Sequence, residues 1–311
     1  MRVSSLIMST SGLAGMQNEQ SSIARLSSQI ATGQRVVAPK DDPVRAPRIM
    51  DLTDRIALRQ QYIANQDKAR LALNYQGTVL QGMRQVLEHA RGILMGAGPN
   101  QEQSLRDQYA QLIENDYRQL KSLANTRDPS GNYIFAGHKT NIEPYAHTAA
   151  APGPGPSTPS TYSGDAGVRR IEIDVGRSVQ VSDNLNQVFQ ATDADAGTGT
   201  DDLLQDLDQI AIDLRSTSLT QAQLDNAVAR LNQALDDLGL IERRVAATNL
   251  EIADTQASTR TLLNEEKNAL GRLVELDEAA AIVELQRRQV TLEAAQRAYA
   301  RISGLSLFNY L

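Results

Sequence analysis

The chain has 311 residues, a formal net charge of −6, no cysteine and only 4% aromatic residues. The acidic balance argues against a nucleic-acid surface, which needs a basic patch, and the missing thiols exclude disulfides and thiolate metal sites. With three Phe and no Trp, the apolar material is mostly aliphatic. This composition favours slender packing of helix on helix over a wide core.

The first helical pattern follows a Ser-rich stretch at residues 1–10, which has no strong period. Its apolar residues form a narrow seam typical of coiled coils. These residues are Met16, Ile23, Leu26 and Ile30. Gly33 is suited to end this helix, because glycine readily adopts the left-handed conformation found after helix C-termini.

The segment Asp41-Asp42-Pro43 predicts a turn followed by a second helix. Either aspartate can cap a helix N-terminus, and proline suits the first turn. Helical patterns then cover about 44–95 and about 101–127, with a Gly- and Pro-containing break between them.

The character of the chain changes after residue 131. Tyr133–Gly137 reads as a short strand, and 148–167 reads as a surface loop rich in Pro, Gly and Ser. Residues 170–181 alternate with period two, which predicts two strands joined by a tight turn near Gly176. We therefore expect a small β-containing insertion in the middle of the chain.

Helical patterns return at about 201–217 and again from about 220 almost to the end, with a break near 265–271. The last stretch carries two apolar rows with a seven-residue repeat. One row is Leu276, Val283 and Val290, and the other is Leu285, Leu292 and Tyr299. Together they make a stripe wider than a two-stranded seam, which suits a helix that contacts more than one partner.

The order of helices, β structure and helices again predicts a mainly α fold with a small β-containing insertion. The N- and C-terminal segments would form an elongated helical bundle, because short helices need partners to stay folded in water. We predict three parts. They are a terminal coiled-coil polymerisation domain of 1–45 with 270–311, a helical rod of 46–132 with 201–269, and a β-rich outer domain of 133–200.

No catalytic, cofactor-binding or metal-binding constellation stands out, so we expect no enzyme and no cofactor. The three histidines, His89, His138 and His147, are badly spaced for a metal site. The aspartates of the loop at 193–202 do not follow the order of a calcium-binding loop. No apolar run approaches the length of a membrane helix, and the N-terminus lacks the pattern of a cleaved signal peptide.

Two motifs resemble the flagellins and their relatives. The first is Gln29-Ile30-Ala31-Thr32-Gly33-Gln34-Arg35-Val36-Val37-Ala38-Pro39-Lys40-Asp41-Asp42-Pro43 near the N-terminus. The second is the C-terminal stretch 286–311, which ends in Leu305-Ser306-Leu307-Phe308-Asn309-Tyr310-Leu311. A third segment, 244–251, is a looser match, with Ala246 where Gly is usual and Leu250 where Arg is usual.

Within this superfamily the sequence is more similar to the hook-associated proteins that join hook to filament than to flagellin. The opening Met1-Arg2-Val3-Ser4, the element Gly131–Gly137 and the ending 306–311 carry that likeness. It covers most of 1–145 and 235–311 and is weak across 146–200.

The resemblance implies a structural subunit of the bacterial flagellum, located outside the cell and exported without a cleaved signal peptide. Its partners would be further copies in a ring, an adjacent hook-associated protein, flagellin, and an export chaperone at the C-terminal helix. Neither nucleic acid nor membrane insertion is implied. A short flagellin that forms the filament itself, and a secreted coiled-coil adaptor, remain alternatives.

We expect the apolar residues of the two chain ends to form the assembly interface. They are Met16, Ile23, Leu26, Ile30, Leu276, Val283, Leu285, Val290, Leu292, Tyr299, Ile302 and Leu307.

Overall fold

The computed structural model describes residues 2–145, 162–189 and 202–308, with the side chains of 2–9, 187 and 302–308 left out. Its contacts divide the chain into two compact units, Met1–Gln60 with Thr261–Leu311 (unit 1) and Gln61–Arg260 (unit 2). Most of the described chain is helical, with one two-stranded sheet. The predicted fold class, mainly α with a small β-containing part, is confirmed.

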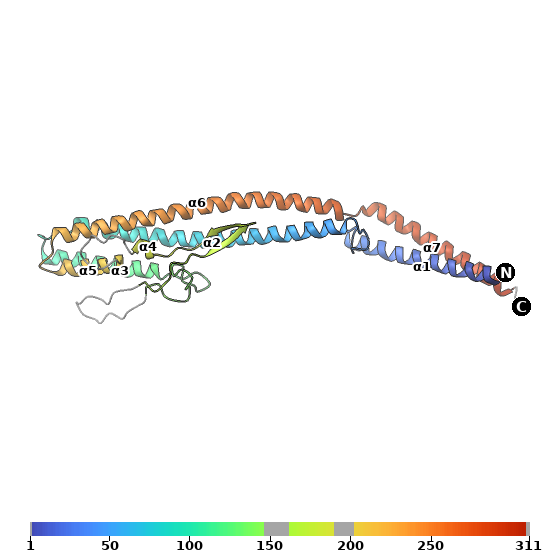
Figure 1. The fold of residues 1–311 in the computed structure, drawn as a ribbon, viewed down its shortest axis with the longest axis horizontal. Coiled ribbons are helices and arrows are strands. Elements are labelled where there is room, and N and C mark those ends of the chain that lie inside the picture. Colours follow the sequence, from blue (N-terminus) through green and yellow to red (C-terminus); the bar gives the residue numbers. More distant parts are fainter. Residues whose placement is uncertain (1, 146–161, 190–201, 309–311) are drawn as a thin grey trace. The chain divides into compact units, whose positions relative to one another are not determined.

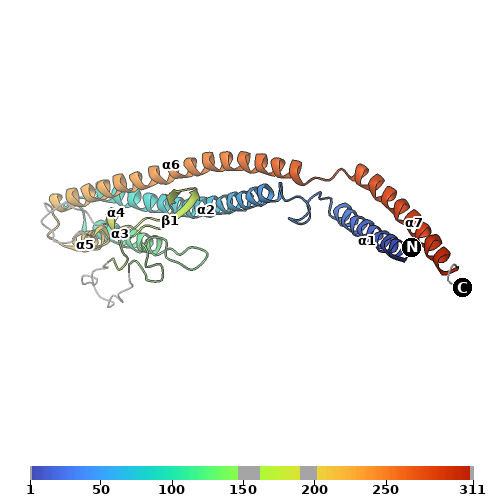
Figure 2. The ribbon, with the colours of Figure 1, turned by 45° about the vertical axis from the view of Figure 1, so that its right-hand side comes forward.

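Unit 1 contains the two terminal helices, α1 (Arg2–Thr32) and α7 (Glu278–Phe308), which pack against each other. They are the blue and red helices that lie together in Figures 1 and 2. Helix α1 begins at Arg2 rather than after residue 10. Ser and Gly are weak helix formers, so this first part has no helical signature of its own, and tertiary context overrides such small propensities.

Helix α1 ends at the glycine that the sequence singles out. Gly33 has φ +66°, its N–H donates to the carbonyl of Ile30 at 3.3 Å, and the N–H of Gln34 donates to the carbonyl of Gln29 at 3.2 Å. These two bonds form a Schellman cap, which satisfies carbonyls that the helix end would leave without partners.

The Asp-Asp-Pro segment forms two successive turns. Asp41 accepts hydrogen bonds from the N–H groups of Val37 and Ala38 at 3.2 and 2.8 Å. Asp42 accepts from the N–H groups of Val44 and Arg45 at 3.2 and 3.0 Å. This second pattern is that of an N-cap, and the following helix α2 runs Ala46–Gly96.

The second long helix, α6 (Gln221–Val274), continues through the position where the sequence suggests a break at 265–271. That expectation is wrong: the chain leaves helix only at 275–277, before α7. Glu and Lys are good helix formers, so the segment 265–271 has the local propensity to continue the helix. Glu266 also accepts hydrogen bonds from two arginines of α2.

Unit 2 adds a second helix pair, α3 (Gln103–Ala124) and α5 (Leu203–Arg215), which pack together. The short helix α4 (Asn186–Phe189) and the hairpin of β1 (Arg170–Asp174) and β2 (Arg177–Gln180) complete the unit. The strands are antiparallel, with Ile171 opposite Val179. The tight turn near Gly176, at φ +65°, is confirmed.

The expected strand at Tyr133–Gly137 does not form. Tyr133 and Ala136 make only isolated bridges, to Arg127 and Asn184, because the chain winds through turns between them. Phe135 is fully buried here, and its carbonyl accepts a hydrogen bond from the Tyr162 hydroxyl at 2.8 Å. The segment is fixed by burial and by a side-chain bond, not by strand pairing.

The few aromatic residues gather in unit 2. Tyr145, Phe135 and Phe189 are fully buried, and the Tyr145 ring lies 5.6 Å from that of Tyr162 and 5.5 Å from that of Phe189, in tilted arrangements. Such pairs stabilise by about 0.5–1.5 kcal/mol beyond the area they bury. The long helices, by contrast, pack through aliphatic side chains.

The three-part division into 1–45 with 270–311, 46–132 with 201–269, and 133–200 stays a prediction. The loop at 148–167 lies mostly outside the described residues, as does most of the loop at 193–202. Among the described helices, none is both long and apolar enough to cross a membrane.

Candidate assembly surface

The α1–α7 pair of unit 1 brings one apolar row of each terminal helix together. Four residues of α1 are half-buried: Met16, Ile23, Leu26 and Ile30. On α7, Leu285, Leu292 and Tyr299 are half-buried as well. The helices run antiparallel, since Tyr299 near the end of α7 lies beside Gly12 near the start of α1.

The second row of α7 remains open. Val283 and Val290 are 65% and 67% exposed, and Ile282 is 44% exposed. Since an α-helix turns about 100° per residue, Val290 is about 160° round α7 from Leu292. The wide stripe therefore splits into one row that packs on α1 and another that the described part of the chain leaves exposed. Whether it contacts another subunit stays a prediction.

Three other predicted residues lie at the ends of α7. Leu276 precedes the helix, is half-buried, and its N–H donates to the carbonyl of Gly33 at 3.2 Å. Arg35 likewise donates its N–H to the carbonyl of Val274 at 2.7 Å. These bonds tie the end of α1 to the link between α6 and α7. The side chains of Ile302 and Leu307 lie outside the described residues.

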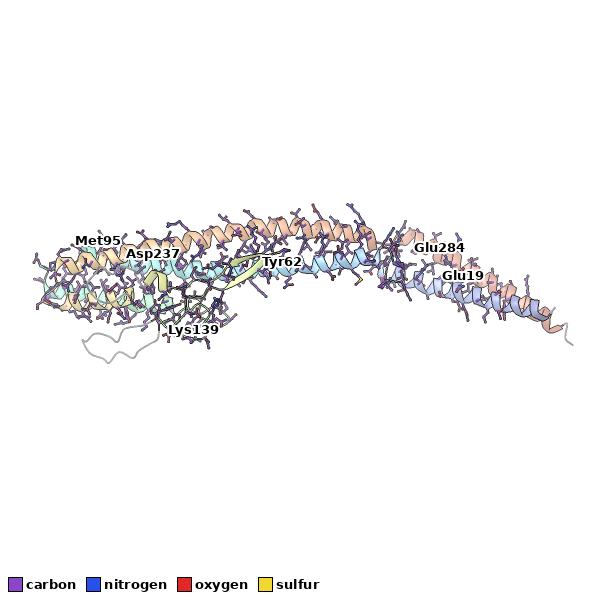
Figure 3. The ribbon with its side chains drawn as sticks, in the orientation of Figure 1. Glu19, Tyr62, Met95, Lys139, Asp237 and Glu284 are labelled. Atoms are coloured by element: carbon purple, nitrogen blue, oxygen red, sulfur yellow. The ribbon has the colours of Figure 1, made fainter. Side chains whose placement is uncertain are left out.

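A charged cluster adds to the α1–α7 contact, and sequence reasoning missed it. Arg288 of α7 donates to Glu19 of α1 at 3.1 Å and to Glu284, one turn earlier on α7, at 2.9 Å. Figure 3 labels both glutamates. The Glu284–Arg288 spacing of four residues is a signal visible in the sequence. The bond from Arg288 to Glu19 joins residues 269 positions apart in the sequence, so no local spacing predicts it.

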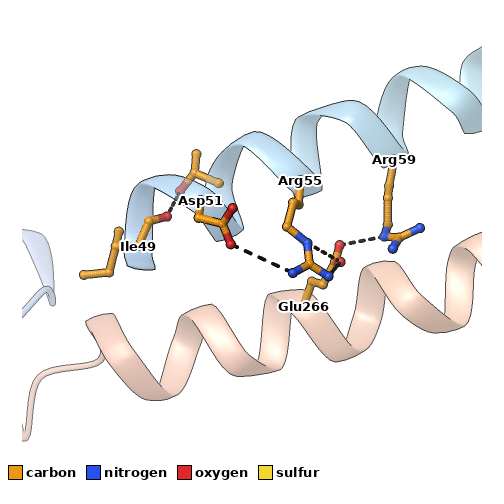
Figure 4. A network of polar contacts seen from close by, with 6 residues as sticks. Ile49, Asp51, Arg55, Arg59 and Glu266 are labelled. Carbon is orange, nitrogen blue, oxygen red and sulfur yellow. Dashed lines mark hydrogen bonds and ion pairs between the residues drawn. The ribbon is translucent and has the colours of Figure 1, made fainter. Parts of the chain in front are cut away.

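Glu266 of α6 is the most enclosed charge of unit 1. Its side chain is 7% exposed, and it accepts bonds from Arg55 and Arg59 of α2, each at 2.7 Å (Figure 4). Burial would raise the pKa of Glu266, but the hydrogen bonds from Arg59 and Arg55 outweigh it and leave the pKa below its usual value. The carboxylate is thus ionised at neutral pH and joins α2 to α6.

Unit 2 has comparable polar links between its elements. Asp183 is buried, and its oxygens accept hydrogen bonds from Gln76 and Gln180, each at 2.6 Å, and from Arg244. Burial raises the pKa of Asp183, an effect that Arg244 opposes. His89 lies 2.8 Å from buried Asp116, so this histidine joins α2 to α3. These contacts link the elements of unit 2 to one another, as structural residues do.

Within the described residues no group of three or more His, Asp or Glu side chains could hold a metal ion. The surface that the structure offers is therefore one of packing: a paired terminal helix with an open apolar row. Such a surface suits assembly with other helices.

Comparison with known proteins shows what this chain is similar to. Residues 3–140 match the bacterial flagellin N-terminal helical region. Flagellar hook-associated protein 3 of Escherichia coli (strain K12) is 26% identical over 99% of both chains. The protein of that name from Salmonella typhimurium is 24% identical, also over 99% of both chains.

A solved structure shares the fold. The flagellar hook-associated protein 3 of Legionella pneumophila has a TM-score of 0.63 and 15% identity, and the match covers 72% of this chain and 98% of that one. At 15% identity, this similarity is evidence for a shared fold alone. The chain is thus similar over its full length to proteins named flagellar hook-associated protein 3, its N-terminal region matches that of bacterial flagellins, and it shares the fold of one such solved structure.

Proposed function

We propose that the protein is a structural subunit of the bacterial flagellum that joins the hook, through another hook-associated protein, to the flagellin filament. The observation that carries this proposal is the full-length match to proteins named flagellar hook-associated protein 3. A junction subunit needs surfaces for several neighbours at once. The open row of α7, on the side of the helix away from the row that packs on α1, supports such a role.

The partners follow from that position. Copies of the chain form a ring, the adjacent hook-associated protein lies on one side of it, and flagellin lies on the other. Val283 and Val290 each expose about two thirds of their surface, and burying an aliphatic side chain of this size stabilises by about 1.5–3 kcal/mol when it is complete. A few such residues per subunit, repeated in every copy of the ring, would stabilise the contacts between subunits.

The exposed apolar row of α7 has to be covered before assembly, because exposed apolar surface promotes aggregation. An export chaperone at the C-terminal helix would supply that cover. The protein would act outside the cell, at the junction of hook and filament, and leave the cell without a cleaved signal peptide. Its role is mechanical, and it catalyses no reaction.

Deletion of the gene in the source bacterium tests the proposal. We expect hooks without filaments, flagellin in the growth medium and loss of swimming, all restored by the wild-type gene in trans. Cells that still carry filaments after deletion would refute the junction role. A second assay separates this role from that of a short flagellin, since purified chain added to filament seeds should not elongate them.

A further inference from the structure

The first turns of α2, which belong to unit 1, expose an apolar face. Met50 and Leu58 are 60% and 42% exposed, and Pro47 is exposed as well. Since an α-helix turns about 100° per residue, these three side chains lie within about 40° of Asp54 round the helix. Asp54 is itself exposed, so the apolar residues surround a carboxylate.

The charge of this face is negative. Asp51 is 66% exposed and lies about 60° from Asp54. The arginines of the same stretch lie about 100° or more away from Asp54, and Figure 4 shows Arg55 and Arg59 directed at Glu266 of α6. We call this surface the acidic face of α2; its residues are Pro47, Met50, Asp51, Asp54 and Leu58.

The open row of α7, also in unit 1, has the opposite charge. Val290 lies about 20° round the helix from Val283, and three arginines lie within about 40° of Val283, whereas the glutamates of α7 are about 80° or more away. The side chains of Arg287 and Arg297 are 78% and 77% exposed. We call this surface the basic face of α7; its residues are Val283, Arg287, Val290, Arg297 and Arg301.

The two faces repeat one pattern with opposite charge. Each has a charged residue with an apolar residue three or four positions before it and another three or four positions after it, which is one helical turn of about 5.4 Å. If the two charges are set against each other, the apolar residues therefore meet whichever way the helices run. The two triplets are Met50–Asp54–Leu58 on α2 and Val283–Arg287–Val290 on α7.

We infer that the basic face of α7 in one copy packs on the acidic face of α2 in the next copy of this chain. Arg287 pairs with Asp54 of the neighbour, and the apolar residues on either side of the pair are buried together. The contact joins two different surfaces, so each copy keeps one of each for a further neighbour. Contacts of that kind close into rings or continue as helical arrays.

This inference rests on the proposed function, because it names the surfaces by which copies meet in the ring. Charge complementarity favours a second copy over flagellin or the adjacent hook-associated protein, since both halves of the pattern are on this chain. A symmetric contact of two basic faces or two acidic faces is disfavoured, because like charges would then face each other.

Cysteine cross-linking provides the test, because the chain has no native cysteine. Two double variants, Met50→Cys with Val290→Cys and Met50→Cys with Val283→Cys, are expressed in the deletion strain, and the isolated hooks and filaments are oxidised. We expect a ladder of multimers on a non-reducing gel from the first variant if the helices run antiparallel, and from the second if they run parallel. A disulfide requires close Cα atoms, and each copy carries both halves of the contact.

Two controls use the same residues. Met50→Cys alone should give at most dimers. Val290→Cys with Leu71→Cys, which changes an exposed leucine further along α2 (68% exposed), should give no ladder. If both Met50 variants are incorporated yet stay monomeric, or are linked to another protein, the inference is wrong. The junction role would survive that result, because it depends on the filaments of the deletion strain.

Charge reversal keeps the inference testable if the cysteine variants are not incorporated. Asp54→Arg alone and Arg287→Asp alone should each lower incorporation about tenfold, because like charges then face each other across the contact. Both residues are exposed in the free subunit, so the helical signal should stay that of wild type. The two changes together should restore incorporation. Equal incorporation of all three variants, or a double variant no better than the single ones, would overturn the proposed contact.

Discussion

Arg288 of α7 lies 3.1 Å from Glu19 of α1, an ion pair that joins residues 269 positions apart. Both side chains are about 30% exposed, so water still screens the pair. The pair lies between the Gly12–Tyr299 contact and the Gly33–Leu276 hydrogen bond, so all three contacts agree with one register of the two terminal helices.

A double-mutant cycle on Glu19→Ala and Arg288→Ala should give a modest coupling of about 0.5 kcal/mol in the free energy of unfolding. The coupling is measured by chemical denaturation of the full chain, with the helical signal as the readout of unfolding. Salt should reduce the coupling further, because partly exposed pairs are screened. A coupling of zero at low salt would mean that the apolar rows alone set the register.

Glu266→Gln should weaken the α2–α6 contact by about 2 kcal/mol, the usual range for hydrogen bonds to a charged group. Hydrogen exchange of the amides near Arg55 and Glu266 measures the loss locally. The pKa of Glu266 is lowered in the fold, so its contribution is present above the pKa of a free glutamate and is lost as the pH falls through the folded value. The variant and wild type should therefore converge in acid.

Asp202 should respond to pH in the opposite sense. It caps α5 by accepting from the N–H of Leu204 at 2.9 Å, but burial raises its pKa to about 7, and its second oxygen has no partner. A carboxyl with a raised pKa binds its proton more tightly in the folded chain. The associated stability is present below the unfolded pKa and is lost as the pH rises towards 7.

Asp202→Asn keeps a cap acceptor and removes the charge, so it should stabilise unit 2 at pH 8, on the order of 1–2 kcal/mol, and have little effect at pH 4. Thermal unfolding at the two pH values measures this difference. A variant as stable as wild type at both pH values would show that the Asp202 carboxylate is not strained by burial.

Gly137→Ala should lower the free energy of unfolding of unit 2 by more than the cost of backbone strain at a positive φ, because the added methyl group would also collide with a neighbouring side chain. Gly137 has φ +71°, and an added Cβ would lie 2.0 Å from the Asp165 carboxylate oxygen, which accepts bonds from the N–H groups of His138 and Gly167. Gly131 has φ +86° with nothing within 4 Å of an added Cβ. Gly131→Ala thus isolates the strain of about 1 kcal/mol, and Gly137→Ala should exceed it in thermal unfolding.

Sequence reasoning reached the elements whose signals are local. The left-handed glycines at 33 and 176, the turn at Asp41, the cap at Asp42 and the apolar rows of seven-residue spacing are all signalled by residues close together in the sequence. The features that sequence reasoning missed depend on contacts between residues that are far apart in the sequence. The bonds from the arginines of α2 to Glu266 of α6 have no local signal. The segment Tyr133–Gly137 is held by burial of Phe135 and by the bond from Tyr162, which local alternation does not reveal. The Arg288–Glu19 pair likewise cannot be read from spacing.

The two rows of α7 allow assembly to be separated from folding. Leu292→Asp places a charge in the half-buried row that packs on α1, and desolvating an unpaired carboxylate there should separate α7 from α1. Unit 2 should stay folded, because its core does not include α7. Such a variant should lose both the α1–α7 pair and incorporation into the flagellum.

Val290→Asp changes the exposed row on the other side of α7 and makes the matched comparison. The charge stays in water in the free subunit, so the helical signal and thermal stability should equal those of wild type, within about 0.5 kcal/mol. Once another subunit covers Val290, the same charge would be buried without a partner, and swimming should fail. If the variant swims normally, the open row of α7 is not an assembly surface. If it unfolds like Leu292→Asp, the two rows do not have the separate roles that their exposure indicates.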